Sequence, residues 1–394
     1  MAKRIGNQEP TQKLVLPYKK SLYKDAVETY QNTGRKAQKW QSTLLNYIMA
    51  LNSDKLWTHA QFGYSVPRQN GKNEIAAMRE MHGLVSGERI LHTAHRTSTS
   101  HMAWERLCGL LDEADIKYDS IKAKGSENIR LADGGKIEFR TRTTLGGLGE
   151  SYDLLVIDEA QEYTTEQATA LKYVIAASAN PQTLYCGTPP TPLSSGTVFM
   201  NLRNEALAGG TIDTGWAEWS VDEESDVNDI DLWYLTNPAL GVRITERTIR
   251  TEISSDTIDF NIQRLGLWLK YNQKSAISKN EWEVLQQDKP PELAGNLFIG
   301  IKYGNNGLNV AVSVAVKTKD DRIFIDVRDC QSIRNGNGWI ISFLKSIDYQ
   351  TVVVDGAGGQ SLLASEMKDS RLKPPILPTV KEVILANSSF EQAI

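Results

Sequence analysis

Short apolar runs alternate with helical patterns along the first half of the chain. The apolar runs have strand length and end in loops; they cover residues 61–66, 88–94, 134–141, 152–160 and 182–190. Between them, apolar positions recur every three to four residues, the spacing of amphipathic helices. The clearest such patterns lie at 35–51, 100–114 and 165–178. This alternation predicts an α/β domain with a mostly parallel sheet, whose ligand site lies at the carboxyl ends of the strands.

The pattern changes after Trp216. An acidic stretch at 218–231 leads into helical patterns at 233–241 and 244–273, which predict a small helical linker subdomain. A boundary rich in proline and glycine follows at 288–296. Beyond it come three strand-like runs, a helix, a strand and a helix. This is the element order of a ribonuclease-H-like fold.

Composition and charge mainly restrict the compartment. The formal net charge is −4, so the chain is not a basic nucleic-acid coat, although a local basic track is enough to contact phosphates. The three cysteines lie far apart without metal-type spacing, which suits a reducing compartment. No segment has the length of a signal peptide core or a membrane helix. We therefore expect a cytosolic protein without a membrane partner, and we expect His92 and His95 in the core or in loops rather than on a metal.

A phosphate-loop motif follows the first of these runs. In the pattern G-x-x-x-x-G-K-[ST], backbone N–H groups surround phosphates and the lysine reaches the outer ones. Gly71 and Lys72 match, whereas Val66 stands at the first glycine and Asn73 replaces the hydroxyl residue that usually holds magnesium. Alone, this match also fits a glycine turn beside a surface lysine. The predicted ATP-binding residues of the loop are Pro67, Arg68, Gln69, Asn70, Gly71, Lys72 and Asn73.

Two adjacent carboxylates strengthen the prediction of a nucleotide site. A buried-type strand at 154–157 ends in Asp158 and Glu159. An aspartate there can hold Mg²⁺, and the next glutamate can orient and deprotonate the attacking water. The pair alone also fits a solvated strand end. Both motifs in this order predict Mg²⁺-dependent hydrolysis of ATP.

Four further residues fit roles around a nucleotide. Thr188 ends the next strand, where helicase-like motors sense the outer phosphate, although an ordinary Gly-Thr-Pro turn also fits. Gln41 could hold adenine through its two-way amide, or lie on a helix surface. Arg68 could contact the γ-phosphate. Arg142 could serve a neighbouring subunit as an arginine finger, but an ordinary surface arginine is the stronger interpretation.

These motifs together resemble the large terminase subunit of tailed bacteriophages, over about residues 35–390. The segments that carry the resemblance are PRQNGKNE (67–74), LLVIDEAQE (154–162), CGTP (186–189), DLWYLTNPALG (231–241) and FNIQRLGLWL (260–269). By resemblance, Lys72 binds the β- and γ-phosphates, Asp158 holds the metal, Glu159 activates water and Thr188 couples hydrolysis to movement. The asparagine after the lysine belongs to this family's variant of the loop.

The resemblance implies a DNA-packaging motor in the host cytoplasm. Such a motor pumps double-stranded DNA into a procapsid through a portal protein, is fed by a small terminase subunit, and acts as several copies in a ring. It also carries a nuclease that uses Mg²⁺ or Mn²⁺. The expected domains are an N-terminal arm with a short helix (1–34), a P-loop ATPase (35–215), a linker subdomain (216–290) and a ribonuclease-H-like nuclease that ends early (291–394).

The nuclease half departs from the family's pattern. A two-metal nuclease needs several carboxylates converging on two cations. Lys302 stands where the family's first strand has an aspartate, and its ammonium would repel metal ions; Asn309 stands near where a second acid is frequent. Asp355 is retained as a candidate metal ligand, although an aspartate that caps the following helix also fits. Nothing in the spacing singles out the other nearby acids, which are Asp326, Asp329 and Glu366. We therefore predict an incomplete nuclease that cuts DNA poorly or not at all.

Two other functions fit part of the pattern. A helicase-like, DNA-stimulated ATPase shares the motor motifs, but the chain shows no second helicase-like domain. A non-catalytic prophage remnant that binds DNA or capsid would be favoured if Val66 and Asn73 abolish turnover. For the packaging motor as for these alternatives, basic residues on one face would contact DNA phosphates. The candidates are Arg130, Lys136, Arg140 and Arg142.

Overall fold

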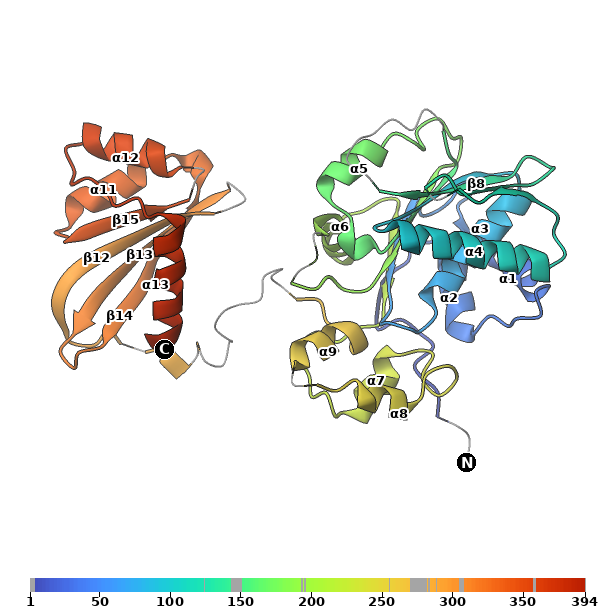
Figure 1. Cartoon of the computed structure of the whole chain (residues 1–394), viewed down its shortest axis with the longest axis horizontal. Coiled ribbons are helices and arrows are strands. Elements are labelled where there is room, and N and C mark those ends of the chain that lie inside the picture. The colour runs from blue at the N-terminus through green and yellow to red at the C-terminus, as the bar shows by residue number, and fades with distance from the viewer. Residues whose placement is uncertain are drawn as a thin grey trace. The chain divides into compact units, whose positions relative to one another are not determined.

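The chain divides into two compact units, Met1–Lys274 and Ser275–Ile394, each with its own sheet (Figure 1). The last domain was expected to begin at residue 291, whereas the division between the units falls at Lys274. The computed structural model describes residues 4–123, 125–142, 151–192, 194, 196–254, 256–269, 282, 284–287, 289–304, 308–356 and 359–393.

A nine-stranded sheet forms the centre of the first unit. In spatial order its strands are β1 (Gln12–Leu14), β11 (Thr214–Glu218), β4 (Gln61–Ser65), β10 (Gln182–Gly187), β9 (Leu154–Asp158), β5 (Arg89–Ala94), β8 (Lys136–Thr141), β7 (Asn128–Arg130) and β6 (Asp119–Ile121). Neighbouring strands from β11 to β8 are parallel. Antiparallel strands are added at both edges. The predicted α/β fold with a mostly parallel sheet is confirmed.

Helices cover both faces of this sheet (Figure 1). They are α1 (Tyr23–Gln31), α2 (Lys39–Ile48), α3 (Lys72–Val85), α4 (Thr97–Glu113), α5 (Thr165–Leu171) and α6 (Thr197–Leu207), with a 3-10 turn at Ala160–Glu162 and a small ribbon of β2 (Lys20–Ser21) and β3 (Ala50–Leu51). None of these helices, nor any other in the described ranges, is long and apolar enough to cross a membrane.

The side chains of β9 show why this central strand is apolar up to its last residue. Leu154 and Val156 pack in the core shared with α2, α3 and α4, whereas Leu155 and Ile157 pack in the core shared with α5 and α6. Successive side chains of a strand point to opposite faces, so a strand covered on both sides needs apolar residues at every position. In β9 the only polar side chain, Asp158, stands at the end of the strand, where the candidate site lies.

The N-terminal arm is part of the first unit. β1 pairs with β11 at the sheet edge, and α1 places Tyr30 in the core beside α3. The linker that follows β11 contains α7 (Ile230–Thr236), α8 (Glu246–Thr251) and α9 (Thr257–Arg264). Each of these helices begins after a residue whose side chain accepts a hydrogen bond from a helix N–H group. These residues are Asp229, Thr245 and Asp256.

The second unit has the element order expected for a ribonuclease-H-like domain. Its elements are β12 (Leu293–Tyr303), β13 (Asn309–Thr318), β14 (Ile323–Ser332), a 3-10 turn (Ile333–Asn335), α11 (Gly338–Ser346), β15 (Thr351–Asp355), α12 (Gln360–Asp369) and α13 (Val380–Ala393). The sheet order is β14-β13-β12-β15, antiparallel except for the parallel pair of β12 and β15. Ile340 of α11 and Leu363 of α12 pack on Ile299 and Ile301 of β12 in a single core.

Candidate nucleotide-binding site

The phosphate loop joins β4 to α3. β4 ends at Ser65 and α3 begins at Lys72. Gly71 has φ +99°, a left-handed conformation that glycine adopts without a steric cost. Within the described residues, the backbone N–H groups of Gln69, Asn70 and Gly71 donate to no acceptor. Free N–H groups before a helix N-terminus, where the helix dipole is positive, suit an anion.

Lys72 and Asp158 meet at the carboxyl-terminal edge of the sheet. Lys72 Nζ lies 2.9 Å from Asp158 Oδ1 and 2.9 Å from Asn73 Oδ1. Asp158 is only 2% exposed. Its burial acts to raise the pKa, but the charges of Lys72 and His92 outweigh that effect and hold the pKa of Asp158 well below its usual range. Asp158 is therefore an ionised, buried carboxylate.

Cys186 and Tyr64 support this pair from the neighbouring strands. β10 lies between β4 and β9, and Cys186 is in register with both Tyr64 and Asp158. Cys186 Sγ lies 3.2 Å from Asp158 Oδ1. Burial raises the pKa of the Cys186 thiol well above its usual value, so the thiol keeps its proton and donates. Tyr64 Oη donates to the backbone carbonyl of Lys72, 3.0 Å away. Neither residue was assigned a role from the sequence. Cys186 could have been found, because the strands that carry the CGTP and VIDE segments both end at the candidate site.

Glu159 occupies a strained backbone position. Its φ is +51°, a conformation that is uncommon for residues other than glycine and costs free energy. Its backbone N–H donates to Asp158 Oδ1 at 2.8 Å. Its carboxylate makes no hydrogen bond or ion pair with the residues that the structure describes. The turn therefore presents a carboxylate without a protein partner beside Asp158, as a base for water requires.

Arg142 is buried beneath the two acids, so the expectation of an ordinary surface arginine is wrong. Its Nη1 donates to the backbone carbonyls of Thr93 (3.1 Å) and Asp158 (2.6 Å), and its Nη2 donates to that of Glu159 (3.1 Å). The side chain ties the ends of β5 and β9 together, and Arg142 is 6% exposed. In this structure its guanidinium contacts the backbone of its own subunit and is not presented to solvent.

The structure brings Gln41 to the loop and Thr188 to the same sheet edge. Gln41 Nε2 donates to the Gly71 carbonyl at 3.2 Å, while its Oε1 accepts from the backbone of Gln38. Both ends of this amide are thus occupied. Thr188 is buried directly after β10, and its backbone N–H donates to Gln161 Oε1 at 3.4 Å. Gln161 is a further residue at this edge that was not singled out from the sequence.

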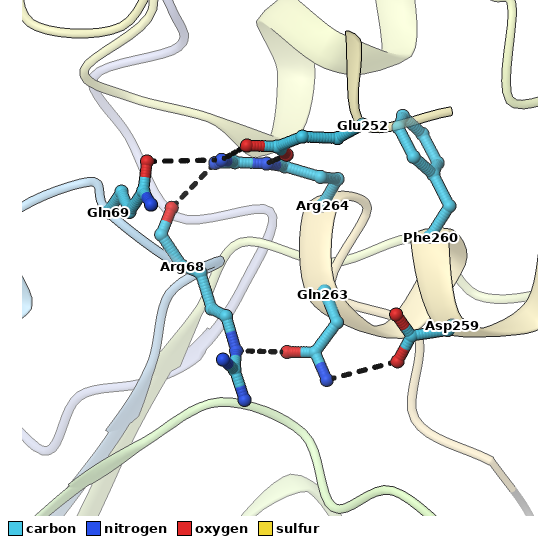
Figure 2. A pocket seen from close by; sticks show the side chains of 7 residues that line it. All are labelled: Arg68, Gln69, Glu252, Asp259, Phe260, Gln263 and Arg264. Carbon is cyan, nitrogen blue, oxygen red and sulfur yellow. Dashed lines mark hydrogen bonds and ion pairs between the residues drawn. The ribbon is translucent and has the colours of Figure 1, made fainter. Parts of the chain in front are cut away.

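The side chain of Arg68 contacts the linker. Its Nε donates to Gln263 Oε1 of α9 at 2.5 Å (Figure 2). Its side chain is exposed and lines a cavity of about 420 Å³ between the loop and the linker. Gln69, also in the loop, accepts a hydrogen bond from Arg264 at 3.4 Å. The backbone carbonyl of Pro67, also in the loop, accepts a hydrogen bond from the Asn70 side chain at 3.0 Å.

The HK97 bacteriophage large terminase is similar in fold to this chain. The comparison covers 94% of this chain and 88% of that one, with a TM-score of 0.58 and 13% identity. The chain has the fold of a bacteriophage large terminase. Weaker similarity is found to the large terminase of a thermophilic bacteriophage in complex with ADP, at a TM-score of 0.42, 11% identity, and coverage of 93% of this chain and 84% of that one. The amino-acid sequence matches no family model and no curated protein.

Two polar clusters of the first unit contain residues for which the sequence predicted other positions or roles: His92, expected in the core or a loop, and the basic residues of β8, candidates for DNA contact. His92 is buried in the core and pairs with Glu80 at 2.6 Å, so the expected core role is confirmed. Lys136 and Arg140 both form ion pairs with Glu138 on the same face of β8. Together with Arg130 they line a cavity of about 360 Å³ near the sheet edge.

In the second unit, Asp355 is paired with a lysine. Lys302 of β12 lies opposite Asp355 of β15 in parallel register, and their side chains form an ion pair. Gly359, not Asp355, is the N-cap residue of α12, so the capping alternative is wrong. Asp326 and Asp329 lie on β14, three strands from β15. No group of three metal-ligand side chains occurs among the described residues of the chain.

Proposed function

We propose that this chain is an ATP-hydrolysing motor that moves double-stranded DNA into a viral procapsid. The observation that carries the proposal is the contact of Lys72 with both Asp158 and Asn73 at the end of the phosphate loop. A half-buried lysine between a carboxylate and an amide oxygen, beside free backbone N–H groups, is suited to bind the β- and γ-phosphates of ATP. The fold of a large terminase supports the packaging role.

The residues present suit a magnesium–nucleotide complex. Mg²⁺ prefers carboxylate and other oxygen ligands, and Asp158 with Asn73 offers both kinds. Bound there, Mg²⁺ would neutralise charge on the phosphates. Lys72 would exchange its contacts with Asp158 and Asn73 for phosphate oxygens. The pKa of Lys72, which burial opposes and Asp158 raises, lies above its ordinary value, so the ammonium is charged.

The remaining site residues take positions around the reacting phosphate. Glu159 is the general base for water, because its carboxylate has no protein partner among the described residues. Arg68 contacts the γ-phosphate after leaving Gln263, and Thr188 couples phosphate release to movement. Gln41 holds adenine after releasing the Gly71 carbonyl.

The proposed partners follow from the terminase fold. They are double-stranded DNA, a portal protein, a small terminase subunit and further copies of this chain in a ring on the portal, all in the host cytoplasm. The second unit is proposed to be a nuclease-like domain that no longer cuts DNA, because the Lys302 ammonium pairs with Asp355 and repels Mg²⁺ or Mn²⁺.

The testing experiment measures ATP hydrolysis and plasmid cleavage in the same tubes. The purified chain is incubated with Mg²⁺ or Mn²⁺, with and without linear double-stranded DNA, beside the Lys72→Ala variant. We expect hydrolysis that requires the divalent cation and is lost in Lys72→Ala, without cleavage. Strand separation of a forked duplex would favour a helicase-like ATPase instead. Absence of cation-dependent hydrolysis in the wild-type chain would favour a non-catalytic remnant.

A further inference from the structure

The linker contacts the phosphate loop through backbone groups and through the buried side chains of Asn237 and Arg264. The two linker segments concerned are residues 236–239, at the end of α7 and just after it, and the end of α9. Both segments belong to the sequence motifs at 231–241 and 260–269, and neither contributes one of the nucleotide-binding residues predicted from the sequence. Their contacts fall on the part of the loop between Pro67 and Gly71, which the phosphates of ATP would face.

On the loop side of this contact, the buried side chain is Asn70. It is 1% exposed, and Asn237 of the linker is fully buried. Asn70 Nδ2 donates to Asn237 Oδ1 at 3.0 Å, and Asn70 Oδ1 accepts from the backbone N–H of Ala239 at 3.0 Å. The same Nδ2 also lies 3.0 Å from the carbonyl of Pro67 and 3.3 Å from that of Arg68. One carboxamide therefore joins two loop carbonyls to the linker.

α9 makes a second contact with the same loop carbonyl. Arg264 Nη1 donates to the carbonyl of Arg68 at 2.7 Å, and the backbone N–H of Arg68 donates to the carbonyl of Gln263 at 3.1 Å. Glu252 pairs with the Arg264 guanidinium and fixes its direction, as Figure 2 shows. The Arg68 carbonyl is thus directed toward the linker by two side chains from different parts of the chain.

Asn237 connects these two contacts. Its Nδ2 donates to the carbonyl of Arg264 at 2.8 Å and to that of Trp233 at 3.0 Å. The amide therefore joins α7 to the end of α9, while its oxygen holds Asn70. Each polar group of the Asn237 side chain has a partner, as a buried amide requires.

From these contacts we infer that Asn237 is a positioning residue for ATP binding and hydrolysis, acting through Asn70. By directing the carbonyls of Pro67 and Arg68 toward the linker, it leaves the loop's N–H groups free for phosphate. The inference rests on the proposed ATPase function. It gives the TNPAL segment a specific role, because Asn237 sets the shape of the loop without touching the nucleotide.

The test separates this role from general stabilisation of the linker. Asn237→Ala removes the acceptor for Asn70 together with the amide donors. Asn237→Asp keeps an acceptor oxygen for Asn70 but loses the donors to Arg264 and Trp233. Thr236→Val is the matched control, because buried Thr236 donates to Leu232 and Arg264 and accepts from Asn237 Nδ2, so it removes linker contacts of the same kind while making none with the loop. For each variant, KM and kcat for ATP, the Kd for ATPγS and the melting temperature are measured.

We expect Asn237→Ala to raise KM and the Kd for ATPγS about tenfold, the loss corresponding to one buried hydrogen bond. Asn237→Asp should melt earlier but bind ATPγS within about threefold of wild type, and Thr236→Val should lower only the melting temperature. Asn70→Ala should raise the Kd as Asn237→Ala does. The double variant should bind no worse than either single one, because residues that act through one contact are not additive.

The inference is overturned if Asn237→Ala binds ATPγS like wild type, or if its effect adds fully to that of Asn70→Ala. It is also overturned if Asn237→Asp and Thr236→Val lose affinity as much as Asn237→Ala does, since that would be a purely structural effect. If Asn237→Ala does not fold, Asn70→Ala, which leaves the contacts within the linker intact, decides the question by the same measurement. A wild-type chain that binds no nucleotide would overturn the proposed function as well, and the two failures are thereby distinguished.

Discussion

Lys302 and Asp355 lie opposite each other in β12 and β15, and their side chains form an ion pair. The lysine is 54% exposed and the aspartate 29%. An exposed pair of this kind contributes little to stability, but it places a positive charge against the acid that a nuclease would need for metal. The Lys302 ammonium thus changes the chemistry open to Asp355, while the parallel register of β12 and β15 is kept.

Replacing Lys302 alone should not restore DNA cleavage. In Lys302→Asp, two carboxylates would face each other, and we expect weak binding of Mn²⁺ but no nicking of plasmid DNA. A two-metal site needs further carboxylates, and Asp326 and Asp329 lie three strands away on β14. Adjacent strands are about 4.8 Å apart, which puts those acids about 14 Å away.

Lys302→Met is the control for loss of the lysine; it should change the free energy of unfolding by no more than about 1 kcal/mol. Nicking by Lys302→Asp that Asp355→Ala removes would contradict this account.

The Lys72–Asp158 pair should make stability depend on pH. Lys72 holds the pKa of Asp158 below its unfolded value of about 3.9. The pair therefore contributes stability that is fully present above about pH 4, and the contribution is lost as the pH falls through the folded pKa. In Lys72→Met the buried carboxylate has lost this partner, and we expect a loss of about 3 kcal/mol at pH 7. The difference from wild type should shrink below about pH 4, as measured by urea unfolding of the first unit.

The control for this pH dependence is the loss of both charges. Lys72→Met combined with Asp158→Asn should recover part of the stability lost in Lys72→Met, because no buried charge is then left without a partner. The double variant should also lack the acid-dependent change in stability that this pair produces. A Lys72→Met chain whose stability deficit is the same at about pH 7 and about pH 3.5 would show that the pair does not control the ionisation of Asp158.

The sequence predicted the main elements, the loop before α3 and the acids at the end of β9 because these depend on local patterns. Apolar runs with loops after them predict buried strands, and the loop before α3 and the acids after β9 follow from the order of motifs. These are properties of short segments. The carboxyl ends of parallel strands lie at one edge, so bringing Lys72 and Asp158 to the same place needed no further information.

The contacts of Arg142 and Asn70 could not be predicted in this way. Arg142 is satisfied by backbone carbonyls of Thr93, Asp158 and Glu159, and a carbonyl has no signature in the sequence. Asn70 meets Asn237 across 167 residues. Contacts of this kind depend on how separate segments dock, and residue type alone does not distinguish a buried arginine from an exposed one.

Removing the carboxylate of Glu159 should slow hydrolysis without weakening nucleotide binding. We expect Glu159→Gln to lower kcat by about 10²–10⁴-fold, the range for loss of a general base, with an unchanged Kd for ATPγS. The amide keeps the size of the side chain and the backbone contacts of Glu159 with Asp158 and Arg142. The melting temperature should therefore stay within a few degrees, the change produced by about 1 kcal/mol or less. Wild-type turnover by Glu159→Gln would assign the base to another residue.

Arg142 should act within its own subunit. Arg142→Ala leaves three carbonyls without their donor and loosens the ends of β5 and β9, so we expect a loss of about 3 kcal/mol in the free energy of unfolding, together with lower turnover. Arg142→Lys should recover part of the stability, because an ammonium can still donate to these carbonyls.

Mixing Arg142→Ala with Glu159→Gln subunits discriminates between action within a subunit and action across an interface. If Arg142 acted across the interface, the intact Arg142 of a Glu159→Gln subunit would complete the site of a neighbouring Arg142→Ala subunit, which keeps Glu159. ATP hydrolysis would then reappear in the mixture. Because Arg142 is buried beneath its own Asp158, we expect the mixture to stay as inactive as its parts. A stable Arg142→Ala chain whose activity is recovered on mixing would place the arginine at a subunit interface instead.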